Sequence, residues 1–356
     1  MRIDEMQQEM VLKKNTTFYH PAIDRLRLIL MFFMCIHLFG FPTSFGGFVR
    51  QFCGFVPIAF FILSGYLVLW DSGNRSAQIA RTIKRTAIVF LVLAVVYFVM
   101  NIFYYYLRGV NVFSAFRSLR FWFNFLVMNV WQFDIGTAIW YVQSLLYAYI
   151  IIYFLEKWNL LRFDWLIAAI LIVLTVCTGE LAGVIRWNIA GYQYIPGNFF
   201  TRALPYILLG NFIHRNINAF RKVKRTWYRC GIACGIALML GEVLLLAYIG
   251  KSGYYSHLLG MPVVAVSVCM LALSDTFHEQ GFEAELGMSR WHINCIYYIC
   301  QPVSIGVVFV LSILGEFTAG IVNYIGIITF FLCFGIAWLI SYINRIFSRK
   351  KKKNHE

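Results

Sequence analysis

The chain is short of charged residues and of proline. Only 13% of its 356 residues are Asp, Glu, Lys or Arg and only seven are proline, whereas 60% are hydrophobic and 18% are aromatic. A soluble globular domain carries about twice that share of charge, so this composition excludes one. Apolar runs of about 18 residues or more recur from end to end, which is typical of a polytopic helical membrane protein.

The sequence also lacks the marks of a cleaved signal peptide and of a metal site. Its first 22 residues are mostly polar, without the short apolar core and small-residue cleavage site of a secretory leader, so we expect the first span to be retained. The nine cysteines are scattered, and no pair has the spacing of a zinc or thioredoxin motif. We therefore interpret them as small apolar side chains and expect no metal.

The apolar runs predict an all-α membrane domain of about ten transmembrane helices over residues 23–346. We place these helices at about 23–39, 52–70, 86–105, 138–156, 164–178, 199–213, 229–249, 258–275, 293–313 and 321–344. A cytoplasmic segment at 1–22 precedes the domain, and a basic cytoplasmic tail at 347–356 follows it. Residues 121–129 are too few to span, so they predict a half-buried external helix, which we favour, or a re-entrant one.

Positive charge is concentrated on one side of this topology. With the N-terminus in the cytoplasm, 24 of the 31 Lys and Arg residues lie on the cytoplasmic side. The positive-inside rule then predicts a multi-pass protein of the plasma membrane with both termini cytoplasmic. The same distribution accounts for the net charge of +15 without nucleic acid, and it brings basic loops next to anionic lipid.

The first predicted helix carries the most informative polar residues. His37 lies in an otherwise apolar run ten residues after Arg27, about 15 Å along a helix. Ionisable groups are costly in lipid, so His37 marks a candidate site. A histidine suits the role of general base near neutral pH; the alternative is a structural histidine bonded to a carbonyl or hydroxyl. Arg25 and Arg27 are either snorkelling anchors or an anion-binding pair at the cytoplasmic mouth.

Further charged residues fall inside or beside other predicted helices. Glu242 lies within an apolar helix, where it is either a candidate acid or a helix-packing hydrogen bond. Asp134 precedes the fourth helix and is either a candidate for the same cavity or a solvated loop carboxylate. Arg186 and Arg202 are candidates for binding an anionic acceptor, or orientation anchors.

Several motifs, in order along the chain, resemble one enzyme family. They are Arg27 with His37, FFILSGYL at 60–67, RTIKR at 81–85, IWYV at 139–142, LPYILLG at 204–210 and YICQP at 298–302. In this order they resemble the membrane-bound acyltransferase family 3, in the branch of adhesin-polysaccharide enzymes and serine-racemase membrane domains. The chain departs from the family pattern where Gln301 replaces a histidine, Thr82 an arginine, and Leu145 and Leu146 a pair of glutamates.

The resemblance implies transfer of an acyl group, taken as acetyl, from cytoplasmic acyl-CoA to a hydroxyl of an extracytoplasmic carbohydrate or other acceptor of the bacterial envelope. It implies His37 as the catalytic base, acting directly or through an acyl-histidine, with Glu242 or Asp134 as its acidic partner. The expected ligands of the CoA phosphates are Arg25, Arg27, Arg81, Lys84 and Arg85. The expected tunnel residues are Ser64, Tyr66, Trp140, Tyr141, Arg202 and Gln301. Oligomerisation with further copies of the chain stays open.

Two other functions stay open. A carrier or exporter for an amino acid or a polysaccharide intermediate would use the same residues to line an alternating-access path. Such carriers often contain inverted repeats, and the sequence contains no detectable repeat. A structural or sensory membrane subunit would leave His37 and Glu242 without a role.

Overall fold

The structure is a computed structural model that describes most of the chain. The described residues are 21–41, 46–68, 74–111, 113–131, 133–178, 198–250, 258–274, 288, 290–313 and 324–353. Most of the predicted N-terminal segment 1–22 lies outside the described residues, as does Arg186.

Every regular element within the described ranges is a helix, which confirms the predicted all-α class. The helices are α2 (Pro21–Phe39), α3 (Gly46–Phe52), α4 (Phe55–Val68), α5 (Arg75–Leu107), α6 (Phe113–Phe116), α7 (Leu119–Leu126), α8 (Thr137–Lys157), η1 (Leu160–Phe163), α9 (Asp164–Thr178), α11 (Phe199–Arg202), α12 (Leu204–Arg215), α13 (Ile217–Arg221), α14 (Arg225–Tyr248), α15 (Gly260–Leu273), α17 (Arg290–Ile313) and α19 (Ile325–Lys353). Each of the ten predicted helices has a counterpart among them.

Seven stretches of helix within the described residues are long and apolar enough to cross a membrane. They are α3 with α4, α5, α8, η1 with α9, α14, α17 and α19. Three of the ten predicted helices correspond to helices outside this set of seven. Helix α2 carries three charged residues, Asp24, Arg25 and Arg27, and helices α12 and α15 have only 12 and 14 residues. The chain is therefore a multi-pass helical protein of a lipid bilayer, and the count of ten spans stays a prediction.

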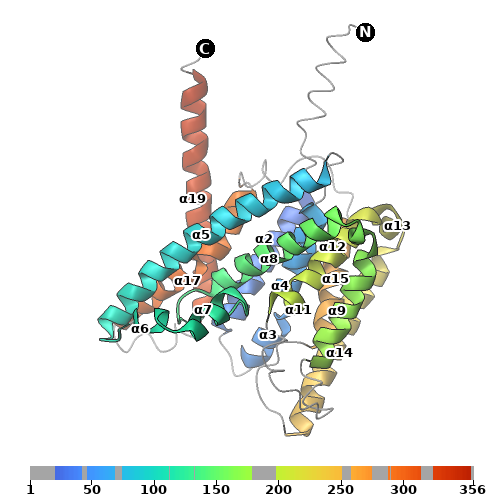
Figure 1. Cartoon of the computed structure of the whole chain (residues 1–356), viewed down its shortest axis with the longest axis horizontal. Coiled ribbons are helices and arrows are strands. Elements are labelled where there is room, and N and C mark those ends of the chain that lie inside the picture. The colour runs from blue at the N-terminus through green and yellow to red at the C-terminus, as the bar shows by residue number, and fades with distance from the viewer. Residues whose placement is uncertain are drawn as a thin grey trace.

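Helix α4 lies at the centre of the bundle and crosses α12 closely (Figure 1). A Cβ added at Gly65 of α4 would overlap the carbonyl of Ile207, and one added at Gly210 of α12 would overlap the carbonyl of Ile62. Small residues at a crossing let two membrane helices approach this closely. Helices α2 and α15 also pack against α4, so these elements form the core.

Helices α5 and α14 are peripheral by comparison. In an apolar 18-residue stretch of each helix, only 17% of α5 and 22% of α14 is buried inside the bundle, against 67% for α3 with α4. Large apolar side chains such as Val95, Phe103 and Leu244 are more than 60% exposed on them. In a membrane protein such faces contact lipid.

The short helix α7 lies on the outside of the bundle and covers most of the predicted segment 121–129. Phe121 and Phe125 are buried, whereas Trp122 and Phe123 are exposed. Its last turn is held by Gln143 of α8, whose Nε2 donates to the Phe125 carbonyl at 2.6 Å. Helix α7 is thus half-buried at the periphery of the bundle, and its side and depth in the membrane stay a prediction.

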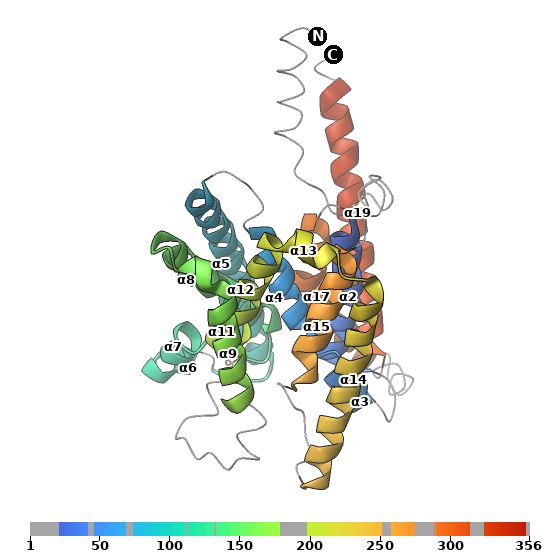
Figure 2. The ribbon, with the colours of Figure 1, turned by 90° about the vertical axis from the view of Figure 1, so that its right-hand side faces the viewer.

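The bundle has two distinct ends, which we call the Arg27 end and the Arg50 end. Helix α2 begins and α4 ends at the Arg27 end, where α5 also begins and where α13 and the last turns of α19 lie (Figures 1 and 2). Helices α3, α6 and α7 lie toward the Arg50 end (Figure 1). Helix α19 continues to Lys353, past the predicted end at 344 and into the predicted tail. The Arg27 end corresponds to the predicted cytoplasmic side, and that orientation stays a prediction.

Candidate functional site

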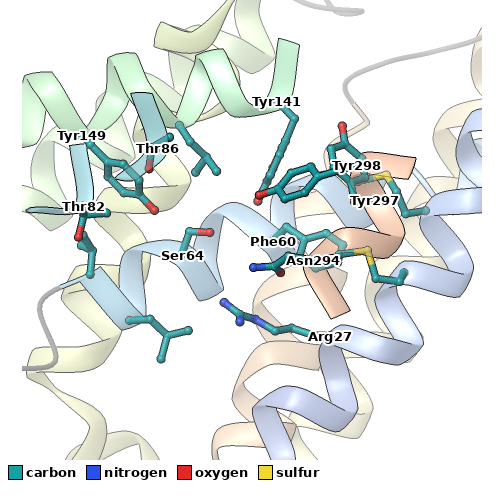
Figure 3. A pocket seen from close by; sticks show the side chains of 15 residues that line it. Arg27, Phe60, Ser64, Thr82, Thr86, Tyr141, Tyr149, Asn294, Tyr297 and Tyr298 are labelled. Atoms are coloured by element: carbon teal, nitrogen blue, oxygen red, sulfur yellow. The ribbon is translucent and has the colours of Figure 1, made fainter. Parts of the chain in front are cut away.

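A cavity of about 250 Å³ lies among α2, α4, α5, α8 and α17, in the half of the bundle nearer the Arg27 end. We call it the Arg27 cavity. Figure 3 shows Arg27 and Asn294 pointing into the space that also receives the hydroxyl of Ser64. Its polar lining residues are Arg27, Ser64, Thr82, Thr86, Tyr141, Tyr149, Asn294, Tyr297 and Tyr298.

Arg27 supplies the one formal charge among the lining residues of this cavity. The residue is only 9% exposed, and its Nη1 lies 4.0 Å from Oδ1 of Asp24, one turn earlier on α2. The Ser64 hydroxyl interacts with the side chains of both Tyr141 and Tyr149, and the Arg27 charge acts on both rings. A buried guanidinium surrounded by hydroxyls suits a ligand group that is anionic or strongly polar.

A second cavity, of about 260 Å³, lies nearer the Arg50 end; we call it the Arg202 cavity. It is formed by the chain between α7 and α8, the first turn of α8, and α11. It brings together three predicted site residues, namely Asp134, Trp140 and Arg202. Asp134 is exposed and Trp140 is partly buried.

Two amide side chains hold the turn that forms one wall of the Arg202 cavity. Gln301 accepts from the Gly136 amide at 2.7 Å and donates to the Asp134 carbonyl at 3.1 Å. Asn101 donates to the Ile135 carbonyl at 2.6 Å and accepts from the Ile135 amide at 3.2 Å. Gln301, predicted as a tunnel residue, is therefore a positioning residue for this wall.

One aromatic layer separates the two cavities. Trp140 lines the Arg202 cavity and the next residue, Tyr141, lines the Arg27 cavity. Phe61 of α4 packs against both, with ring centroids 6.2 Å from Trp140 and 4.8 Å from Tyr141. The Arg202 guanidinium lies 5.7 Å from the centre of the Trp140 ring, within cation–π range. Phe61, Trp140 and Tyr141 thus form a continuous aromatic contact from the lining of one cavity to that of the other.

His37 lies at the other end of α2 from Arg27 and lines neither of the two cavities. Its Nδ1 is 3.3 Å from the Arg50 carbonyl, and Arg50 Nε donates to the His37 carbonyl at 2.9 Å. A carbonyl only accepts, so in this pairing Nδ1 carries the proton and Nε2 keeps the lone pair that a base requires. The charge of Arg202, which lines the Arg202 cavity, also acts on the His37 ring.

Two predicted site residues have structural contacts instead. Both carboxylate oxygens of Glu242 accept backbone hydrogen bonds at the start of α15, from Leu259 at 2.9 Å and Gly260 at 3.2 Å. The structure does not bring Glu242 to His37. Tyr66 is 1% exposed and packs edge-to-face on His214 at 5.0 Å, so it lies outside both cavities.

The predicted ligands of the CoA phosphates separate into two groups. Arg27 lines its cavity, whereas Arg81, Lys84 and Arg85 are exposed, because α5 turns Thr82 and Thr86 toward that cavity. Arg25 is partly buried and is not a lining residue.

Sequence reasoning missed Asn101, Tyr149 and Asn294. Each is a polar residue within an apolar helical run, which is the signal that singled out His37. Tyr149 follows Tyr141 by eight residues of α8, which leaves the two about 80° apart around the helix, and both line the Arg27 cavity.

No family model matches the chain, and neither a curated protein nor a solved structure does so.

Proposed function

We propose that the protein is an acyltransferase of the plasma membrane. It moves an acyl group, taken as acetyl, from cytoplasmic acyl-CoA to a hydroxyl of a carbohydrate or other envelope acceptor on the opposite side. The supporting observation is the pair of cavities in opposite halves of the bundle that meet at one aromatic layer. Such an arrangement suits two reactants that arrive from opposite faces.

The Arg27 cavity suits the donor side. At about 250 Å³ it lies just below the range of about 300–1,000 Å³ for sites of drug-sized ligands. It is too small for a whole acyl-CoA, so we place only the acyl end of the pantetheine arm in it and leave the nucleotide outside. The exposed Arg81, Lys84 and Arg85 lie on the turns of α5 that line the cavity, where they suit the phosphates of that nucleotide. Arg27 then contacts the polar arm.

The Arg202 cavity suits the acceptor, because it combines an aromatic ring, a guanidinium and the exposed carboxylate of Asp134. His37 Nε2 takes the proton of the acceptor hydroxyl while its oxygen attacks the thioester carbonyl. The C–O bond forms, the C–S bond breaks, and the proton passes from His37 to the departing CoA thiolate. An acyl-histidine intermediate reaches the same products in two steps. Either route requires the layer at Phe61 and Trp140 to open.

The test is acyl-CoA-dependent release of free CoA by the full chain in proteoliposomes supplied with an envelope glycan. His37→Gln keeps a side-chain donor for the Arg50 carbonyl but removes the base, so we expect release to fall by about 10²–10⁴-fold. Arg50→Gln is the matched control, because it removes the other half of the same contact and leaves the imidazole. Full release by folded His37→Gln would contradict the proposal.

One observation favours a carrier as the second candidate. The predicted helices 52–70 and 199–213 are both interrupted toward the Arg50 end, between α3 and α4 and between α11 and α12, and α4 and α12 pack together. Discontinuous membrane helices at a central crossing are a feature of secondary transporters. Uptake of radiolabelled amino acids by proteoliposomes without any acyl donor would favour the carrier, and donor-dependent CoA release would favour the enzyme.

A further inference from the structure

A third cavity, of about 310 Å³, lies at the Arg27 end between α5, α8, η1 and α12. We call it the Arg75 cleft. Three guanidinium groups line it, those of Arg75, Arg162 and Arg215, against the single carboxylate of Glu156. The acyl transfer proposed above makes no use of it, and no sequence motif marks it.

Asp164 holds two of the lining side chains from behind. The residue is fully buried, and its carboxylate accepts from Asn211 Nδ2 at 2.7 Å and pairs with the Arg215 guanidinium. Both side chains are therefore fixed in place before any ligand arrives. Because Asp164 neutralises much of the Arg215 charge, the other two arginines dominate the electrostatics of the cleft.

Arg75 and Arg162 supply that charge. Both are exposed, and neither takes part in an ion pair with the residues that the structure describes. Arg162 is positioned by the ring of Phe163, whose centroid lies 4.7 Å from its guanidinium carbon. Three guanidinium groups therefore meet two carboxylates, that of Asp164 behind the cleft and that of Glu156 in its lining, which leaves the cleft with an excess of one positive charge.

We propose that the Arg75 cleft binds a phosphate-bearing group. Planar guanidinium groups form paired hydrogen bonds to phosphate oxygens, and several together select phosphate over smaller monovalent anions. Basic pockets between helices at the cytoplasmic end of a membrane protein are where anionic lipid head groups bind. Arg75 lies seven residues before Thr82 on α5, about 10 Å from the Arg27 cavity, so the cleft is a separate site.

Two arms of one experiment identify the source of the phosphate. In the first, native mass spectrometry of the purified full chain measures binding of phosphatidylglycerol against phosphatidylcholine. In the second, thermal unfolding in neutral detergent measures stabilisation by inorganic pyrophosphate. The variant is Arg75→Gln with Arg162→Gln, which changes two exposed side chains, and the matched control is Lys222→Gln with Lys224→Gln, which removes two exposed charges beside α13.

We expect the Arg75→Gln/Arg162→Gln variant to bind phosphatidylglycerol, pyrophosphate or both at least about tenfold more weakly than the wild type, and the control to bind like the wild type. A loss confined to the lipid arm identifies a head group, a loss confined to the pyrophosphate arm identifies a soluble compound, and a loss in both shows recognition of the phosphate alone. Equal binding by variant and wild type in both arms, or equal weakening in the control, overturns the proposal.

Discussion

The Arg27 cavity and the Arg202 cavity are similar in volume but are built differently. Every side chain that lines the Arg27 cavity comes from a regular helix, whereas the Arg202 cavity is formed largely by the turn before α8. That turn is held in place by the amides of Asn101 and Gln301. Helix packing therefore fixes the first cavity, while a few side-chain hydrogen bonds fix the second. A donor common to many reactions suits a fixed site, and a variable acceptor suits a site on a turn.

Replacing Arg27 and Arg202 by glutamine, one at a time, is the strongest test of whether each cavity binds a different reactant. Arg27→Gln removes the buried charge from the donor side, so we expect the KM for acyl-CoA to rise by about 10- to 100-fold with little change in the KM for the acceptor. Arg202→Gln is expected to raise the KM for the acceptor by a similar factor, with little change in the KM for acyl-CoA. Steady-state kinetics with each substrate varied in turn would measure both. If the two variants raised the same KM, the assignment of one cavity to each reactant would be wrong.

The glycines of the two regions differ in what surrounds them. A Cβ at Gly65 would overlap the backbone carbonyl of Ile207, which two packed helices hold in place, whereas a Cβ at Gly136 would overlap the Trp131 indole. We expect Gly65→Ala to lower the free energy of unfolding by about 2–3 kcal/mol. Gly136→Ala is expected to cost less, about 1–2 kcal/mol, because a side chain can shift more easily than a backbone carbonyl; the cost comes from the φ of +148° and from the Trp131 hydrogen bond to the Ile135 carbonyl, which the shift breaks. Thermal unfolding in detergent would rank them, and the reverse order would contradict the comparison.

Gln301 tests whether the turn is held by its hydrogen bonds. Gln301→Ala removes the partners of the Gly136 amide and the Asp134 carbonyl, so we expect a loss of about 1–2 kcal/mol in stability and a higher KM for the acceptor alone. Gln301→Glu keeps the acceptor for the Gly136 amide, so it should lose less stability. An unchanged acceptor KM in Gln301→Ala would show that the turn does not shape the site.

The smallest effect is expected from the exposed basic residues of α5. Replacing Arg81, Lys84 and Arg85 by glutamine leaves the cavity lining intact, so we expect the KM for acyl-CoA to rise only severalfold at low salt. Exposed charge interactions are worth about 0.2–1 kcal/mol each and are screened by salt. The difference from the wild type should therefore vanish near 1 M salt, and a salt-independent loss as large as that of Arg27→Gln would place these residues inside the donor site.

Helix positions were predictable from the sequence because apolar runs set them, but hydropathy alone does not show the breaks at Gly54 and Ala203. Local residues mark both, because Gly54 directly precedes α4 and Pro205 lies in the first turn of α12. The continuation of α19 to Lys353 was missed because lysine is a good helix former that hydropathy excludes.

The sequence predicted residue types at the site better than it predicted their directions. Ser64 and Tyr66 belong to one motif, yet two residues turn a helix by about 200°, so only Ser64 faces the Arg27 cavity. One residue turns a helix by about 100°, which separates the exposed Arg81 from Thr82 on α5. Glu242 of α14 accepts hydrogen bonds from the start of α15, 18 residues later in the chain. That contact depends on how α14 packs on α15, and no local sequence pattern signals such packing.

The most direct test of the central claim is the face of the membrane from which each cavity is reached. Ser64→Cys and Asp134→Cys, each in a background with the nine native cysteines replaced, would be treated with a charged methanethiosulfonate reagent in right-side-out and in inverted vesicles. The account predicts that Cys at position 64 reacts only from the cytoplasmic face and Cys at position 134 only from the opposite face. Reaction of both from the same face would contradict it.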